Sequence, residues 1–338
     1  MSTIQTNAII DASGGNTATV NGVRPTSDSL KGRNFFHNGD FQVWQRGTSL
    51  THTSDQFLAD RWKVTPPGTA NTTSAQVFDT TLQQNTLKIT INQAGYIQFQ
   101  QSVEGFKWAH NKAITISFWA KADTNMNCTF NKLLKHGNNV SALLATSPVQ
   151  NITTTLTKFT ATFPADDLSS YTEDGNSHIR FGWTVQSPSN GNLSAGNDFY
   201  IGQVKAEIGD SATSFESRSY GEEIALCQRY YEKVLAGPSS SYIGWSAGTI
   251  YGSGTYLGHF TASVPMRTTP TFSTNAYDSA SKMSVVSGAN TYEISSIAVT
   301  GNNQRLRINA DGSLSGIIGQ GAYIQVQNGY YVAFEAEY

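Results

Sequence analysis

The chain has 338 residues, of which only 14% are charged, and its formal net charge at pH 7 is −2. This length allows two domains with sizeable cores, and the near-neutral charge excludes a basic nucleic-acid-binding surface. No run of roughly 18 apolar residues occurs, which excludes a membrane-spanning helix and membrane insertion.

Residues 1–33 are small, polar and rich in glycine. Such a segment cannot bury enough apolar surface to fold alone, so we expect an arm that docks on its own body, on a sister subunit or on another protein. The first ten residues, MSTIQTNAII, lack the basic start and apolar stretch of a signal peptide, so ordinary secretion is not expected.

The stretch NGDFQVWQRG, residues 38–47, combines a turn with short alternation of apolar and polar residues. The alternation predicts a first strand with Phe41 and Val43 on one face and Gln42 and Trp44 on the other. A Trp and an Arg beside a turn also suit a ligand site. We interpret them instead as architecture, with Arg46 holding a carboxylate near Asp60.

Strict alternation of apolar and polar residues predicts strands with one buried face throughout residues 34–218. Clusters of Gly, Asn and Ser separate these strands, and no helical pattern intervenes. This arrangement is typical of a jelly-roll β-sandwich. The clearest strands are Leu87–Ile91, Ala113–Ala120, Lys158–Phe163, His178–Gln186 and Phe199–Ile208.

A helical pattern begins after Ser219. Ser219 and Glu222 have the spacing of a capping box, and Gly237-Pro238 would end the helix. Its apolar face would contain Ile224, Cys227, Tyr231, Val234 and Leu235. We expect this helix to link the two domains.

Residues 239–338 return to a strand pattern, which predicts a second, smaller C-terminal β-sandwich. The fold class is therefore all-β, with an arm at 1–33, a jelly roll at 34–218, and a linking helix with the second β domain at 219–338. The expected strands of the last domain are Tyr242–Trp245, Thr249–Tyr251, Tyr256–Ser263, Arg305–Ile308, Tyr323–Gln327 and Tyr330–Tyr338.

Catalytic motifs for nucleophilic, phosphoryl-transfer or metalloprotease chemistry do not occur in the sequence. A pair of glycosidase carboxylates in DDLSSYTEDG is one interpretation, but the turn-like composition of this segment favours a solvated loop. We therefore expect no enzyme and no cofactor. The acidic residues considered are Asp166, Asp167, Glu173 and Asp174.

Asp40 and Asp198 are candidate ligands for a structural calcium ion, which prefers oxygen ligands in irregular loops. A turn in which Asp40 caps backbone amides is the interpretation we favour. Cys128 and Cys227 are too far apart for a zinc pattern and are expected to be buried thiols.

Two groups of aromatic residues are candidates for contact with a ligand or partner. Trp119 lies out of phase with the apolar face of its strand, beside Thr115 and Ser117. A second packed layer is the alternative for this side chain. Rings separated by Gly and Ser form the other group, as a recognition surface or a subunit interface. These residues are Tyr242, Trp245, Tyr251 and Tyr256.

Several stretches together resemble virion proteins of tailed phages, especially marine and cyanophage-like tail fibres. NGDFQVWQRG, followed by ADRW (Ala59–Trp62), resembles the start of a jelly-roll module similar to carbohydrate-binding modules. Phe199–Lys233 resembles the last strand and exit helix of that module. Residues 4–25 resemble the N-terminal arm of such fibres, and Val264–Ser273 matches loosely.

The resemblance implies a virion structural protein, made in the host cytoplasm and assembled as a homotrimeric tail fibre or appendage. The arm would attach to other virion proteins, and the distal part would bind host surface glycan without catalysis. No internal repeat is present, so a short appendage is expected. A capsid decoration or adaptor without a ligand and a polysaccharide depolymerase are the alternatives. Attachment would use the apolar residues Ile4, Ile9, Ile10, Val20 and Val23.

Overall fold

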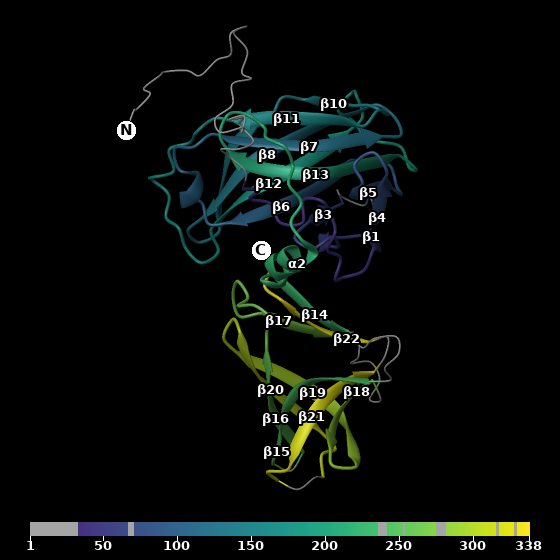
Figure 1. Ribbon diagram of the computed structural model, residues 1–338, viewed down its shortest axis with the longest axis vertical. Helices are drawn as coiled ribbons and strands as arrows, with labels where there is room; N and C mark the ends of the chain where they lie inside the picture. Colours follow the sequence, from purple (N-terminus) through teal and green to yellow (C-terminus); the bar gives the residue numbers. More distant parts are fainter. Residues whose placement is uncertain are drawn as a thin grey trace, which may run out of the picture. The chain divides into compact units, whose positions relative to one another are not determined.

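The structure is a computed structural model that describes residues 33–66, 71–235, 242–252, 254–274, 282–315, 318–327 and 330–338 (Figure 1). The residues proposed for virion attachment, Ile4, Ile9, Ile10, Val20 and Val23, lie outside these ranges.

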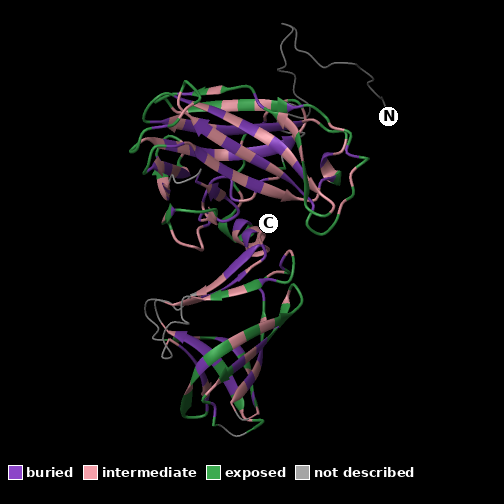
Figure 2. Ribbon diagram, turned by 180° about the vertical axis from the view of Figure 1, so that it is seen from behind, coloured by how far each residue is buried: buried purple, intermediate pink, exposed green. Residues whose placement is uncertain are grey.

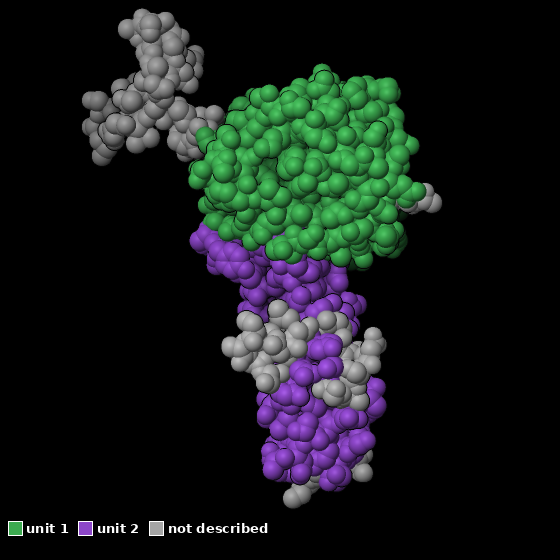
Figure 3. Space-filling model, turned by 90° about the vertical axis from the view of Figure 1, so that its right-hand side faces the viewer, with its two compact units in different colours: residues 1–42, 48–58, 62–218 green, residues 43–47, 59–61, 219–338 purple. Residues whose placement is uncertain are grey.

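The chain divides into two compact units, coloured separately in Figure 3. Unit 1 consists of Met1–Gln42, Thr48–Leu58 and Trp62–Arg218, and unit 2 of Val43–Gly47, Ala59–Arg61 and Ser219–Tyr338. One division between the units falls after Arg218. In addition, two short segments of the earlier sequence are part of unit 2.

Unit 1 contains two antiparallel sheets. The first has the order β1 (Ser49–His52), β4 (Thr72–Asp79), β5 (Gln84–Ile91), β13 (Asp198–Ile208), β7 (Ile114–Ala122) and β11 (Thr157–Phe163). The second has the order β10 (Gln150–Ile152), β8 (Met126–His136), β12 (His178–Gln186), β6 (Ile97–Glu104), β3 (Lys63–Thr65) and β2 (Gln56–Phe57), and β9 (Val140–Thr146) pairs with β8.

The chain alternates between these sheets, which gives the jelly-roll topology that the sequence predicts. β5, β7, β11 and β13 belong to the first sheet, while β6, β8 and β12 belong to the second. The late strand β13 lies between β5 and β7, and β12 lies between β6 and β8. Strands distant in sequence are therefore neighbours, so each sheet forms only when the whole unit folds.

Aromatic side chains fill the space between the two sheets. Trp183 of β12 stacks on Phe99 of β6, with ring centroids 5.3 Å apart and an interplanar angle of 6°. Trp62 and Phe36 pack against Trp183 in the same core, with ring centroids 5.6 and 5.7 Å from that of Trp183. The prediction that Trp183 is a core residue is confirmed, because only 1% of its surface is exposed.

Unit 2 contains a barrel and a small sheet, where we expected a sandwich. Its all-β character and its helix agree with the prediction, but six strands close on themselves (Figure 2). The barrel order is β15 (Tyr242–Gly252), β16 (Thr255–Thr261), β20 (Arg305–Gly312), β19 (Asn290–Gly301), β18 (Met283–Ser287) and β21 (Gly321–Gln327). The sheet consists of β14 (Tyr231–Leu235), β22 (Tyr331–Glu335) and β17 (Thr271–Thr274).

Closure of this barrel depends on glycine where β15 and β16 approach each other. A Cβ atom added at Gly248 would lie 2.1 Å from the carbonyl oxygen of Leu257. Only a residue without a side chain permits this backbone separation. Closure removes the two exposed edges that an open six-stranded sheet would leave.

The helix α2 (Tyr220–Gln228) begins as predicted but ends earlier. Ser219 and Glu222 form the expected capping box, in which the Ser219 hydroxyl accepts a hydrogen bond from the Glu222 N–H at 3.3 Å. The prediction that the helix continues to Leu235 is wrong, because Tyr231–Leu235 pairs with β22. Aromatic and β-branched residues favour strands, and a partner strand decides between the two conformations here.

The predicted opening strand at residues 41–44 is also wrong, since these residues are not in a strand. Phe41 has a positive φ of 51°, and its N–H donates a hydrogen bond to the carbonyl of Asn38 in a turn.

Among the residues described, no helix is long and apolar enough to cross a membrane.

Candidate functional site

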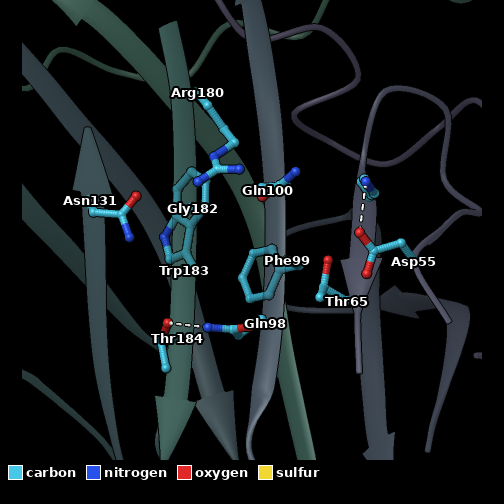
Figure 4. Close-up of a pocket in the computed structure, with 11 residues that line it drawn as sticks. Asp55, Thr65, Gln98, Phe99, Gln100, Asn131, Arg180, Gly182, Trp183 and Thr184 are labelled. Atoms are coloured by element: carbon cyan, nitrogen blue, oxygen red, sulfur yellow. Dashed lines mark hydrogen bonds and ion pairs between the residues drawn. The ribbon is translucent and has the colours of Figure 1, made fainter. Parts of the chain in front are cut away.

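A polar pocket of about 220 Å³ lies on the second sheet of unit 1 (Figure 4). The strands β3, β6, β8 and β12 supply most of its lining, and Asp55 lies beside them. The lining residues are Asp55, Lys63, Thr65, Gln98, Phe99, Gln100, Asn131, Arg180, Gly182, Trp183 and Thr184.

Strand alternation explains why the pocket is polar. Along β12, Phe181, Trp183 and Val185 are buried, whereas Arg180, Gly182 and Thr184 are partly exposed. Successive side chains point to opposite faces of a sheet, so the polar set is on the face away from the sandwich core. Phe99 and Trp183 are only 1% exposed, so their rings belong to the core and offer no stacking surface.

Strand register aligns the polar side chains in two rows across the sheet. Gly182 pairs with Gln100 on one side and with Asn131 on the other, and Lys63 pairs with Gln100. In the next row Thr184 pairs with Gln98, which pairs with Thr65. At about 4.8 Å between strands, the first row crosses four strands and is about 14 Å long, and the second crosses three strands and is about 10 Å long.

Gly182 forms the floor of the pocket between Gln100 and Asn131. A Cβ atom at this position would lie 3.3 Å from the Asn131 side-chain oxygen, so even alanine would narrow the space. That oxygen, Asn131 Oδ1, is buried and accepts no hydrogen bond from a described residue.

Charge in the pocket comes from three side chains. Lys63 Nζ contacts Asp55 Oδ2 at 2.8 Å, and this contact lowers the pKa of Asp55 although burial acts to raise it. Burial lowers the pKa of Arg180, and the charge of Asp55 opposes that effect. Arg180 thus holds a partly desolvated positive charge on β12, two residues before Gly182.

The aromatic residues proposed from the sequence do not gather at one site. Trp119 is half-buried in β7 of the first sheet, so it is not part of the pocket, which is on the second sheet. Trp245 and Tyr256 are 7% and 0% exposed and belong to the barrel core, whereas Tyr242 and Tyr251 are 42% and 66% exposed.

The expectation that Trp245 and Tyr256 form a recognition surface is therefore wrong. Trp245 stacks on Phe272 with ring centroids 5.8 Å apart, and the Tyr256 hydroxyl lies 3.0 Å from Ser246 Oγ. A register shift between Gly244 and Ser246 places two consecutive side chains of β15 inside. Such a bulge breaks the simple alternation on which the prediction depended.

The two candidate calcium ligands lie beside different parts of β13, one near its middle and one at its start. The N–H of Val204 bonds the carbonyl of Gly39, next to Asp40, at 2.8 Å. Asp198 begins the same strand, six residues earlier and about 20 Å away at about 3.3 Å per residue. Asp198 instead contacts Lys88 Nζ at 2.8 Å. No group of three or more potential metal ligands occurs among the described residues.

In the acidic loop DDLSSYTEDG, residues 166–175, the carboxylates of Glu173 and Asp174 accept hydrogen bonds from backbone N–H groups. Glu173 accepts from the N–H of Phe106 at 2.7 Å and of Lys107 at 3.3 Å, and these bonds lower its pKa although burial acts to raise it. Hydrogen bonding from Ser177 lowers the pKa of Asp174. A general acid needs a raised pKa, so these two carboxylates are suited to structure and not to proton donation.

Arg46 holds a carboxylate inside unit 2, as the sequence suggests. Its guanidinium lies 3.6 Å from Asp60 and 3.3 Å from Glu335, and it covers the Tyr231 ring at 3.5 Å from the ring centre. Arg61 pairs with Glu337 in the same cluster. Burial raises the pKa of Asp60 to about 7, and Arg46 opposes that effect.

Sequence reasoning missed the pocket, although its strand β12 was predicted with the observed bounds, His178–Gln186. The apolar phase of that strand predicts a buried face and does not indicate a ligand site. The signal that could have indicated the pocket lies in the opposite phase of the strand, at Arg180, Gly182 and Thr184. There a glycine lies between a charged and a hydroxyl side chain on a half-exposed strand.

No family model and no curated protein matches the chain. Among solved structures, a CBM4 structure is 21% identical with a TM-score of 0.35, over 51% of this chain and 98% of that one. The CBM22-1 xylan-binding domain from Paenibacillus barcinonensis is 12% identical with a TM-score of 0.32, over 48% of this chain and 95% of that one.

The enzymatically active domain of tailspike protein 4 from bacteriophage CBA120 is 15% identical with a TM-score of 0.34. That match spans 52% of this chain and 21% of the tailspike chain. At these identities and scores, the ligands and activities of the three proteins say nothing about the pocket.

Proposed function

We propose that unit 1 is a non-catalytic glycan-binding module in a short virion appendage, such as a tail fibre. The observation that carries the glycan proposal is the pocket with its two rows of polar side chains on the second sheet. Sugars present many hydroxyl groups, each of which donates and accepts hydrogen bonds. Gln98, Gln100 and Asn131 offer both donors and acceptors to such a ligand.

The composition of the pocket favours binding over hydrolysis. Glycoside hydrolysis uses two carboxyl groups that face each other across the scissile bond. Asp55 is the one acidic residue among the described lining residues, and its carboxylate is paired with Lys63. The depolymerase alternative therefore lacks a carboxylate pair at this site.

The virion role is proposed from the sequence resemblance of residues 4–25, 38–47 and 199–233 to tail-fibre proteins. In a homotrimer, three pockets would act together, and avidity would exceed the affinity of each pocket. The second candidate, a capsid decoration or adaptor without ligand, is favoured by the exposed rings of Tyr242 and Tyr251 on unit 2.

Filling the pocket tests the glycan proposal directly. Gly182→Leu places a side chain against Asn131, and we expect it to abolish retention of the protein on polysaccharides that retain the wild type. Gly175→Leu is the matched control, because a Cβ at Gly175 meets nothing within 4 Å. Equal retention of Gly182→Leu and wild type would overturn the assignment of the pocket.

Removal of residues 1–33 tests the role of the arm. We expect the shortened protein to fold, with an unchanged unfolding temperature, but not to join assembling particles. Imaging of the intact virion separates the two candidates, since a tail position supports adhesion and a capsid position supports decoration. Incorporation of the shortened protein at the wild-type level would contradict the role of the arm.

A further inference from the structure

Arg180 is a cation of the proposed glycan pocket that forms no ion pair with a described residue. No hydrogen bond or ion pair joins its guanidinium to another described residue, and its side chain is partly buried. Figure 4 draws the guanidinium along β12 toward Gly182 and Gln100, at the edge of the polar rows. Because Gly182 has no side chain, the space beside the guanidinium stays open.

The other charges of the pocket leave this cation uncompensated. Lys63 and Asp55 are 2.8 Å apart, so their charges largely cancel. Asp55 acts on Arg180 at longer range and forms no contact of ion-pair length with it. The described lining therefore has a net charge of about +1, concentrated at Arg180.

A neutral ligand would bury Arg180 further without compensating its charge. Removal of a charged group from water costs free energy unless an opposite charge replaces the lost hydration. A carboxylate meets this need particularly well, because the guanidinium offers two parallel N–H donors at the spacing of the two carboxylate oxygens. The amide and hydroxyl rows remain free for the uncharged part of the same sugar.

We propose that the pocket is specific for an acidic glycan, with a sugar carboxylate on Arg180 and sugar hydroxyls on Gln100 and Asn131. The ligand class is a polysaccharide that contains hexuronate or another carboxylated sugar. This inference rests on the proposed glycan-binding function and adds the charge of the ligand to it. Arg180 acts here as the specificity-determining residue.

Affinity electrophoresis against a panel of polysaccharides tests the inference. The panel contains polygalacturonate, alginate and hyaluronate, each beside its carboxyl-reduced neutral form, together with xylan and mixed-linkage β-glucan. We expect retardation by at least one acidic polymer and at least tenfold weaker binding to its carboxyl-reduced form. Arg180→Gln should lose at least tenfold in affinity for the acidic form, and Arg180→Lys should lie between Arg180→Gln and wild type.

Arg305→Gln is the matched control, because it removes an exposed arginine from the barrel of unit 2 and changes the net charge equally. It should bind acidic polymers as the wild type does. Thermal unfolding of the Arg180 variants confirms that they are folded. A loss shared by Arg180→Gln and Arg305→Gln would show that net charge, not the pocket, drives retention, which would overturn the inference.

The remaining outcomes distinguish the acidic specificity from the glycan-binding function on which it rests. If neutral polymers are bound, Gly182→Leu abolishes that binding, and carboxylated forms are bound no better, then glycan binding stands and the acidic specificity is wrong. If no polymer of either kind is retained, the proposed function and the inference fail together. Equal loss of acidic and reduced forms in Arg180→Gln would also refute the carboxylate contact.

Discussion

His52 lies in β1 of unit 1, where neither ring nitrogen has a hydrogen-bond partner among the described residues. Its side chain is fully buried, and the neighbouring strand places Thr72 and Ser74, which are also buried, beside it. A protonated imidazolium would have no counter-charge in these surroundings. Burial accordingly lowers the pKa of His52 from 6.5 to about 4.

The lowered pKa makes the stability of unit 1 depend on pH. Between pH 6.5 and about 4 the unfolded chain binds a proton at His52 that the folded chain does not bind, so the free energy of unfolding falls as pH falls. The stabilisation is complete above pH 6.5 and is lost as pH falls through about 4. The difference between the two pKa values corresponds to about 3 kcal/mol.

We expect His52→Leu, which removes the titrating group at similar volume, to be free of this loss. Urea unfolding at constant ionic strength between pH 4 and 7.5, followed by Trp fluorescence, gives the difference in free energy of unfolding between variant and wild type. That difference should stay constant above pH 6.5 and shift by about 3 kcal/mol in favour of the variant toward pH 4.

Other titrating groups cancel in this comparison because both proteins contain them. NMR titration of the His52 ring provides a second measurement, and its resonances should not report protonation until the pH approaches 4. A difference that is flat from pH 7.5 to 4, or a ring that titrates near 6.5, would refute the reasoning.

Three further substitutions test unit 2 through its free energy of unfolding. Ser219→Ala removes the capping box of α2 and should cost about 1 kcal/mol, and an unchanged unfolding midpoint in urea would contradict the role of the cap. Asp60→Asn removes a carboxyl whose pKa is raised by burial to about 7. The raised pKa contributes stability that is present below pH 4 and lost as pH rises through 7, so the free energy of unfolding of the variant should increase relative to the wild type over that interval. A pH-independent difference would be inconsistent with the raised pKa. Gly248→Ala forces β15 and β16 apart and should cost about 3 kcal/mol. Gly252→Ala is the control, because a Cβ there meets nothing within 4 Å, and it should cost less than about 1 kcal/mol. Similar losses of stability in both variants would argue against the close approach of the two strands.

Local patterns predicted the jelly roll well because one face of each strand is buried along its whole length. The bounds of β12 were predicted in full, and those of β11 and β13 to within one residue. The capping box of α2 was also predictable, because Ser219 and Glu222 are only three residues apart and interact locally.

The failures occur where contacts distant in sequence decide the structure. Tyr231–Leu235 has a helical pattern but pairs with β22, about a hundred residues later. Trp245 has the spacing of a surface residue, but a bulge turns it into the barrel. The pocket depends on the register of β3, β6, β8 and β12, which no single stretch of sequence encodes.

Unit 2 is discontinuous in sequence, and this affects how the protein can exchange parts with relatives. Arg46 and Glu335, 289 positions apart, contact each other within this unit, and Arg61 pairs with Glu337 in the same cluster. A recombination that replaced everything up to Arg218 would separate these two pairs, of which Arg61–Glu337 is buried, and leave carboxylates without their cations. A crossover that replaced only residues 62–218 would keep both pairs and still exchange every lining residue of the pocket except Asp55. We therefore expect binding specificity to be inherited on that inner segment, while Val43–Gly47 and Ala59–Arg61 are inherited together with the downstream unit.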